Sequence, residues 1–122
     1  MNVQYANKAY TKAMVSTSAR PLDLVILLYD GGIEFLHKSI FYMNQNKLQE
    51  KLHYMGKAMA IIEYLLATLD KQAGGEVARN LERLYVYMLT ELTHANLKNN
   101  IEKVSHIEGL LKELRSAWRD IR

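Results

Sequence analysis

Glu and His residues recur three residues apart at three places in the chain: Glu34/His37, Glu50/His53 and Glu91/His94. On a helix this spacing places a carboxylate and an imidazole on the same face. Ferritin-like di-iron proteins use such pairs, with further glutamates, projecting into the core of a four-helix bundle. The pattern therefore raises the hypothesis of a di-iron bundle enzyme.

The distribution of apolar residues argues against a metal site. Glu34 and His37 fall on the polar side of their helix, the second pair falls outside the apolar arc, and His94 lies opposite the apolar arc. The ligands of a metal ion must point toward one site, whereas these side chains are predicted to point in different directions. No Cys is present, and Gly74-Gly75 lacks the strand and the Lys-Ser/Thr of a phosphate-binding loop. We expect no enzyme activity, no metal and no cofactor.

Four long helices are predicted to carry these residues, within an all-α chain of 122 residues, 49% of them hydrophobic. Pro21 suits a first helical position, while asparagines and the Gly74-Gly75 pair supply the breaks. The predicted ranges are 21–43, 48–70, 76–97 and 101–121. Because short connections make consecutive helices antiparallel neighbours, residues 21–122 are predicted to form an up-and-down four-helix bundle.

The first two helices carry more apolar surface than a bundle core usually needs. Beside its main stripe, the first helix has a second one, and the second helix has an apolar flank: Leu24, Leu28, Phe35 and Tyr42; Tyr54, Ala58, Ile61 and Leu65. Leaving such side chains in water would forgo roughly 1.5–3 kcal/mol each. Two interpretations remain: both helices are central in an irregular bundle, or one flank is a docking groove for another helix.

Two further features bear on how the bundle packs: a glycine pair in the first helix and the twenty residues that precede this helix. Gly31-Gly32 indicates either a kink or close approach by another backbone. Val3, Ala6 and Tyr10 recur at helical spacing, which predicts a short helical or extended segment, residues 1–20, packed on the bundle; a frayed terminus is the alternative.

Charge and hydropathy exclude two classes of partner. The formal net charge is +3 without a dense Lys/Arg cluster, which gives little support for nucleic-acid binding. The longest apolar run, 24–29, is too short to span a bilayer, and the N-terminus lacks the apolar stretch of a secretory signal. We therefore expect a cytoplasmic protein without membrane insertion.

A series of short motifs, in order along nearly the whole chain, resembles the FliS family of flagellar export chaperones. They are Tyr10, Pro21, Leu-Leu-Tyr-Asp-Gly at 27–31, Gly-Gly-Glu at 74–76, Asn80-Leu81, Leu84-Tyr85, Ala-Asn at 95–96, Leu-Arg-Ser-Ala-Trp at 114–118 and Ile121. One departure precedes Pro21, where Arg20 stands in place of the usual serine cap.

The resemblance implies a chaperone and not an enzyme. Its client would be the disordered C-terminal region of flagellin, which it would keep from polymerising early and deliver to the flagellar type III export gate. Residues 1–20 would cover the client site. Tyr10 and Tyr29 match family motifs, and the helical wheel adds further candidates for client binding: Leu24, Leu28, Phe35, Ala58, Ile61, Tyr64 and Leu65. A competing interpretation is a self-associating bundle whose extra apolar face forms a homodimer.

Overall fold

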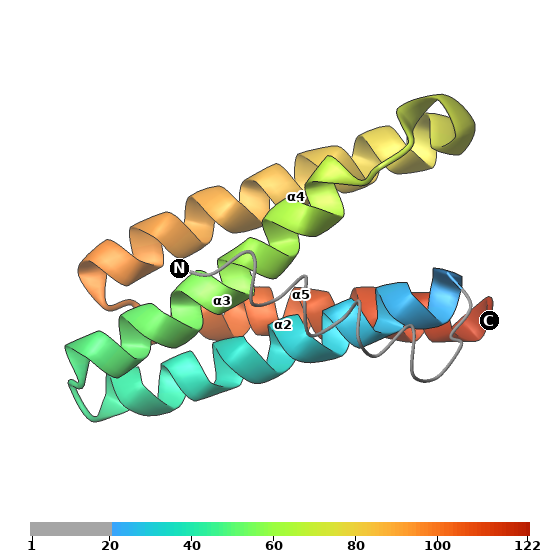
Figure 1. The fold of residues 1–122 in the computed structure, drawn as a ribbon. Coiled ribbons are helices and arrows are strands. Elements are labelled where there is room, and N and C mark those ends of the chain that lie inside the picture. Colours follow the sequence, from blue (N-terminus) through green and yellow to red (C-terminus); the bar gives the residue numbers. More distant parts are fainter. Residues whose placement is uncertain (1–20) are drawn as a thin grey trace.

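The structure, a computed structural model, describes residues 21–122. The expectations for residues 1–20, Tyr10 included, lie outside this part. The described residues form four helices: α2 (Pro21–Asn44), α3 (Leu48–Ala67), α4 (Lys71–Lys98) and α5 (Ile101–Asp120). Figure 1 shows these helices running up and down beside one another. The prediction of an all-α four-helix bundle is confirmed.

The helices form a ring in which each packs against two others. α2 packs against α3 and α5, and α4 packs against the same two helices from the other side. Apolar side chains from all four helices fill the centre and are almost completely removed from water: Leu36, Met55, Ile62, Met88, Leu92, Ile107 and Leu111. The core therefore consists of the main apolar stripe of each helix, as expected for an amphipathic bundle.

The boundary between α3 and α4 differs from the prediction. α3 ends at Ala67, before the expected Asp70, because Asp70 caps the next helix: its Oδ1 accepts a hydrogen bond from the Ala73 N–H at 3.0 Å. α4 therefore begins at Lys71 instead of residue 76. The predicted glycine break is present inside α4, where Gly75 has φ 55° and ψ −128°. A turn capped by Asp70 thus precedes the break at Gly75. The positions of the glycines alone do not predict this turn.

Gly32 lies in contact with neighbouring helices, and α2 runs through it as one helix. A Cβ at this position would stand 3.4 Å from Cδ1 of Leu111 on α5 and 3.6 Å from Cγ2 of Ile61 on α3. The nearest atoms at Gly32 thus belong to side chains and not to another backbone. A small residue here lets α3 and α5 both approach α2.

The orientation of α3 also differs from the helical-wheel prediction. Leu48 and Leu52, which share a helical stripe with the buried Met55 and Ile62, are 61% and 44% exposed. Ala58, Ile61 and Leu65, expected at the flank, are buried. α3 is therefore rotated so that its flank faces α2, with which it packs more extensively than with α4.

Two glycines offer a matched test of this backbone. Gly75→Ala should lower the free energy of unfolding by roughly 1–3 kcal/mol, because its φ/ψ region is essentially restricted to glycine. Gly109→Ala should raise it by roughly 0.5–1 kcal/mol, because this glycine is inside α5 and a Cβ there meets nothing within 4 Å. Urea denaturation of both variants measures the difference. No loss of stability in Gly75→Ala would contradict the geometry at Gly75, and a loss in Gly109→Ala would contradict the open space at Gly109.

The four helices within residues 21–122 are 20 to 28 residues long. None of the helices in this range is long and apolar enough to cross a bilayer.

Candidate functional site

The three Glu-x-x-His pairs do not converge on one point. Glu34 pairs with Lys38 on the surface of α2, with 3.3 Å between Oε1 and Nζ. Glu91 of α4 pairs with Lys103 of α5 at 3.2 Å. The middle pair is exposed near the start of α3. Within residues 21–122, no three His, Asp or Glu side chains are grouped so that they could hold a metal ion.

Three of the sequence motifs meet in one cross-section of the bundle, centred on Tyr29. The hydroxyl of Tyr29 on α2 is hydrogen-bonded to the hydroxyl of Tyr85 on α4, and its ring centroid lies 6.5 Å from that of Trp118 on α5. Both tyrosines are buried. Removal from water raises the pKa of both phenols above the usual value. Tyr29 therefore joins α2 to the opposite side of the core.

The next residue, Asp30, joins α2 to α5 at the surface. Its Oδ1 accepts a hydrogen bond from Nη1 of Arg115 at 2.8 Å and lies 3.5 Å from Nη2 of Arg119. A charge-assisted bond of this length is stronger than a neutral one. The segments 27–31, 84–85 and 114–118 thus serve together to hold the helices in place.

Aromatic side chains gather on the opposite flank of α2, where it packs against α3. Phe35 stacks on Tyr54 with 6.2 Å between ring centroids, and Tyr42 stacks on the same ring at 5.7 Å. Nζ of Lys57 lies 5.3 Å from the Phe35 ring, and that of Lys38 lies 5.4 Å from the Tyr54 ring. We call Phe35, Tyr42 and Tyr54 the aromatic face.

The antiparallel register of α2 and α3 brings most of the predicted site residues onto this flank. Phe35 faces Tyr54, and Gly32 faces Ile61, so Leu28 lies level with Leu65. Leu24 shares the helix face of Phe35, since eleven residues are close to three helical turns. The candidates that lie along the contact between α2 and α3 are Leu24, Leu28, Phe35, Ala58, Ile61, Tyr64 and Leu65.

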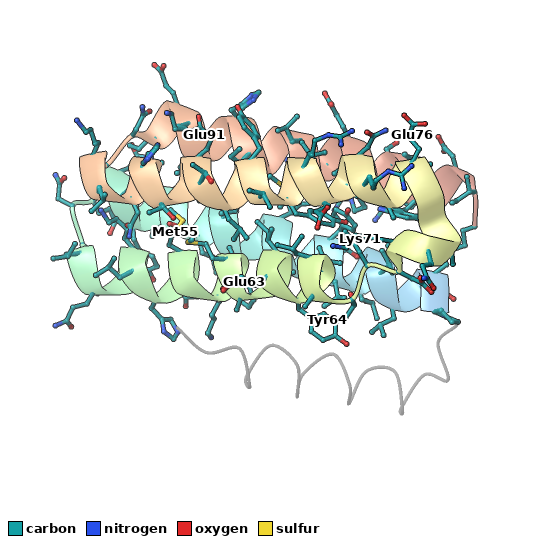
Figure 2. All side chains as sticks on the ribbon, turned by 90° about the horizontal axis from the view of Figure 1, so that it is seen from above. Met55, Glu63, Tyr64, Lys71, Glu76 and Glu91 are labelled. Atoms are coloured by element: carbon teal, nitrogen blue, oxygen red, sulfur yellow. The ribbon has the colours of Figure 1, made fainter. Side chains whose placement is uncertain are left out.

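These candidates differ in how accessible they are. Leu28, Ala58, Ile61 and Leu65 are buried: Leu28 is 3% exposed and Ile61 1%. Leu24, Phe35 and Tyr64 are only partly buried. Figure 2 shows the Tyr64 ring pointing away from the other three helices, whereas Met55 points into the bundle. The partly buried residues therefore keep accessible area, whereas the four buried ones belong to the hydrophobic core.

Two predicted site residues are not part of this group. Tyr29 lies in the core and faces α4 and α5, and Tyr10 lies outside the described residues. The sequence interpretation did not select Tyr42 and Tyr54, although both stood on the predicted apolar flanks. Their spacing, seven residues from Phe35 for Tyr42 and four from Ala58 for Tyr54, was the available signal.

Comparison with known proteins agrees with these motifs. Residues 1–122 match the family described as flagellar protein FliS. The flagellar secretion chaperone FliS of Salmonella typhimurium is 37% identical over 118 residues, which are 93% of this chain and 87% of that protein. FliSB of Pseudomonas aeruginosa is 36% identical over 124 residues, 99% of this chain and 98% of the relative.

More distant relatives carry the same name. FliS of Bacillus subtilis, also a flagellar secretion chaperone, is 29% identical over 119 residues, which are 98% of this chain and 87% of the relative. The resemblance inferred from the short motifs is thereby confirmed. With a match over its full length and relatives above 30% identity, the chain belongs to the FliS family, a family of flagellar secretion chaperones and not of enzymes.

Proposed function

We propose that this flagellar export chaperone binds the C-terminal region of flagellin in the cytoplasm, prevents its premature polymerisation and delivers it to the flagellar type III export gate. Membership of the FliS family supports the export role. The observation that carries the choice of binding surface is the apolar flank shared by α2 and α3, with the aromatic face at its centre.

A disordered client suits such a surface. Ordering a flexible segment costs conformational entropy, which contact with a long apolar flank can offset. Leu24, Phe35 and Tyr64 are distributed along the flank and retain accessible area. An amphipathic client helix would place apolar residues on it at spacings of three and four.

Residues 1–20 are proposed to cover this flank in the empty chaperone, with Tyr10 as an anchor. A cover of this kind would protect the apolar side chains until the client displaces it. It must bind weakly, since the apparent client affinity falls by the fraction of molecules that is open. A weakly bound cover would thus protect the flank of the empty chaperone and still be displaced by the client.

Isothermal titration calorimetry with a synthetic peptide of the flagellin C-terminus tests the proposal. We expect submicromolar binding, a negative heat-capacity change from apolar burial, and a gain of helical circular dichroism. Absence of binding at peptide concentrations in the high micromolar range would contradict it. Light scattering of the same samples tests the homodimer interpretation, since a constitutive dimer that ignores the peptide would favour self-association over flagellin binding.

A further inference from the structure

A cavity of about 230 Å³ lies at the end of the bundle where the turn between α2 and α3 meets the end of α4. Asn46, Lys47, Leu48, Lys51 and Asn99 line it. Two of these residues are cationic, two carry amides, and none carries a carboxylate. The lining therefore favours an anionic occupant over a cationic one.

Lys51 is buried beside this cavity without an acidic partner. Its side chain is 6% exposed, and Nζ donates to the backbone oxygen of Asn96 at 3.0 Å and to Oδ1 of Asn99 at 3.2 Å. Both acceptors are neutral, and the ion pairs within residues 21–122 do not include Lys51. A buried ammonium is costly unless a negative charge compensates it. The negative end of α4 supplies part of this compensation, and one N–H of the ammonium remains.

The start of α3 adds positive potential to the same place. Lys47 is the N-cap residue of α3, and its side chain makes no capping hydrogen bond, whereas Asp70 and Asn100 cap the two following helices. Leu48, which lines the cavity, and Leu52, one helical turn further along α3, are 61% and 44% exposed. A cationic cavity is thus continuous with an exposed apolar stripe on the flank of α3 that faces away from Tyr54.

We propose that this cavity binds a carboxylate of a polypeptide whose neighbouring apolar side chain rests on Leu48 and Leu52. Lys47 and the remaining N–H of Lys51 bind the carboxylate oxygens, since charge-assisted hydrogen bonds of this kind are the strong ones. The source of the carboxylate, an acidic residue of the exported client, rests on the proposed function. The chemistry of the site does not, because a small carboxylate can probe it without any client.

The test is a titration of the ¹⁵N-labelled full-length chain with N-acetyl-leucine, which carries a carboxylate beside a leucyl side chain. We expect saturable shifts at the backbone amides of Lys47, Leu48 and Asn99, with a dissociation constant on the order of millimolar, typical of one such anchor. N-acetyl-leucinamide, which has the same side chain and no charge, should produce none. Lys47→Ala should weaken binding about five-fold or more, whereas Lys112→Ala, an exposed lysine on α5, should not change it.

Three results would overturn the proposal: equal shifts with the neutral amide, equal shifts with chloride or phosphate (an adventitious ion only), or undiminished binding by Lys47→Ala. Lys51→Met should abolish the shifts if this variant folds. If it does not fold, Lys47→Ala still tests the proposal, because Lys47 is exposed and its loss should not unfold the bundle. Failure of the flagellin peptide to bind would leave the N-acetyl-leucine result intact. Equal binding of that peptide by wild type and Lys47→Ala would remove the client as the source of the carboxylate.

Discussion

Phe35→Ala is expected to weaken binding of the flagellin C-terminal peptide by roughly ten- to a hundred-fold, because burying a phenylalanine side chain contributes roughly 1.5–3 kcal/mol. Phe35 is partly buried and stacks on Tyr54 at the contact between α2 and α3. Among the sequence-predicted candidates on α2, which are Leu24, Leu28, Tyr29 and Phe35, it has the largest side chain with accessible area. The measurement is calorimetric titration, and circular dichroism establishes that the variant is folded at the temperature used.

Phe41 provides the matched control on the same helix. It is 54% exposed, and six positions place it about 240° away from Phe35 around the helix axis. Phe41→Ala therefore removes an equally large apolar side chain from a different face. Because the Phe41 ring meets that of Tyr42 only edge-on, with 5.1 Å between centroids, this variant should change the affinity far less than Phe35→Ala. If both variants bind the peptide like wild type, the aromatic face is not the client site; if Phe41→Ala alone weakens binding, the client lies on the opposite flank.

Periodicity predicted much of this flank, and its limits are physical. Leu24 and Phe35 were identified because apolar residues recurring on one side of a helix must meet something apolar. A helical wheel predicts which side of the helix a residue faces but not how deeply that residue is buried. It therefore treated Leu28 like Leu24 and Phe35, although Leu28 is buried. A charged residue introduced at position 28 would therefore lower the free energy of unfolding as well as any affinity for the client.

The buried Lys51 shows a second limit. Its burial depends on acceptors 45 and 48 residues away in the sequence, at Asn96 and Asn99. A single helix pattern contains no information about such distant partners, and lysine is almost never fully buried without one. The sequence therefore predicted a four-helix bundle, although it misplaced the boundary between α3 and α4, and it could not predict how the ends of the helices are joined.

The family motifs have a structural role that their spacing in the sequence does not reveal. Tyr29 and Asp30 are adjacent in sequence but point to different helices, one to the hydroxyl of Tyr85 and the other to Arg115. Their partners lie 56 and 85 residues away. The motif around residue 29 is thus explained by packing of the bundle, while the proposed client surface lies on the neighbouring flank of the same helix. Variants at Tyr29 should consequently change stability, and variants at the exposed part of the flank should change client binding.

Tyr29 gives the largest expected change in stability. Tyr29→Ala removes a fully buried ring and should lower the free energy of unfolding by about 3–5 kcal/mol. Tyr29→Phe keeps the ring but leaves the buried hydroxyl of Tyr85 without the bond it makes to Tyr29, which should cost roughly 1–3 kcal/mol. Adding Tyr85→Phe removes that unpaired group, so the double variant should recover part of the loss. Urea denaturation of both single variants and the double variant measures the coupling; strictly additive losses would show that the two hydroxyls do not stabilise each other.

The same pair predicts how stability depends on alkaline pH. Burial raises the pKa of both phenols in the folded chain, whereas in the unfolded chain they ionise near pH 10. Below about pH 10 both states are protonated and the full stability is present. Above it the unfolded chain binds fewer protons than the folded one, so the free energy of unfolding falls as pH rises. The variant carrying both Tyr29→Phe and Tyr85→Phe should lose less stability between neutral pH and about pH 11 than wild type. Since the two proteins differ only at these two hydroxyls, parallel curves would mean that the core does not hold them protonated.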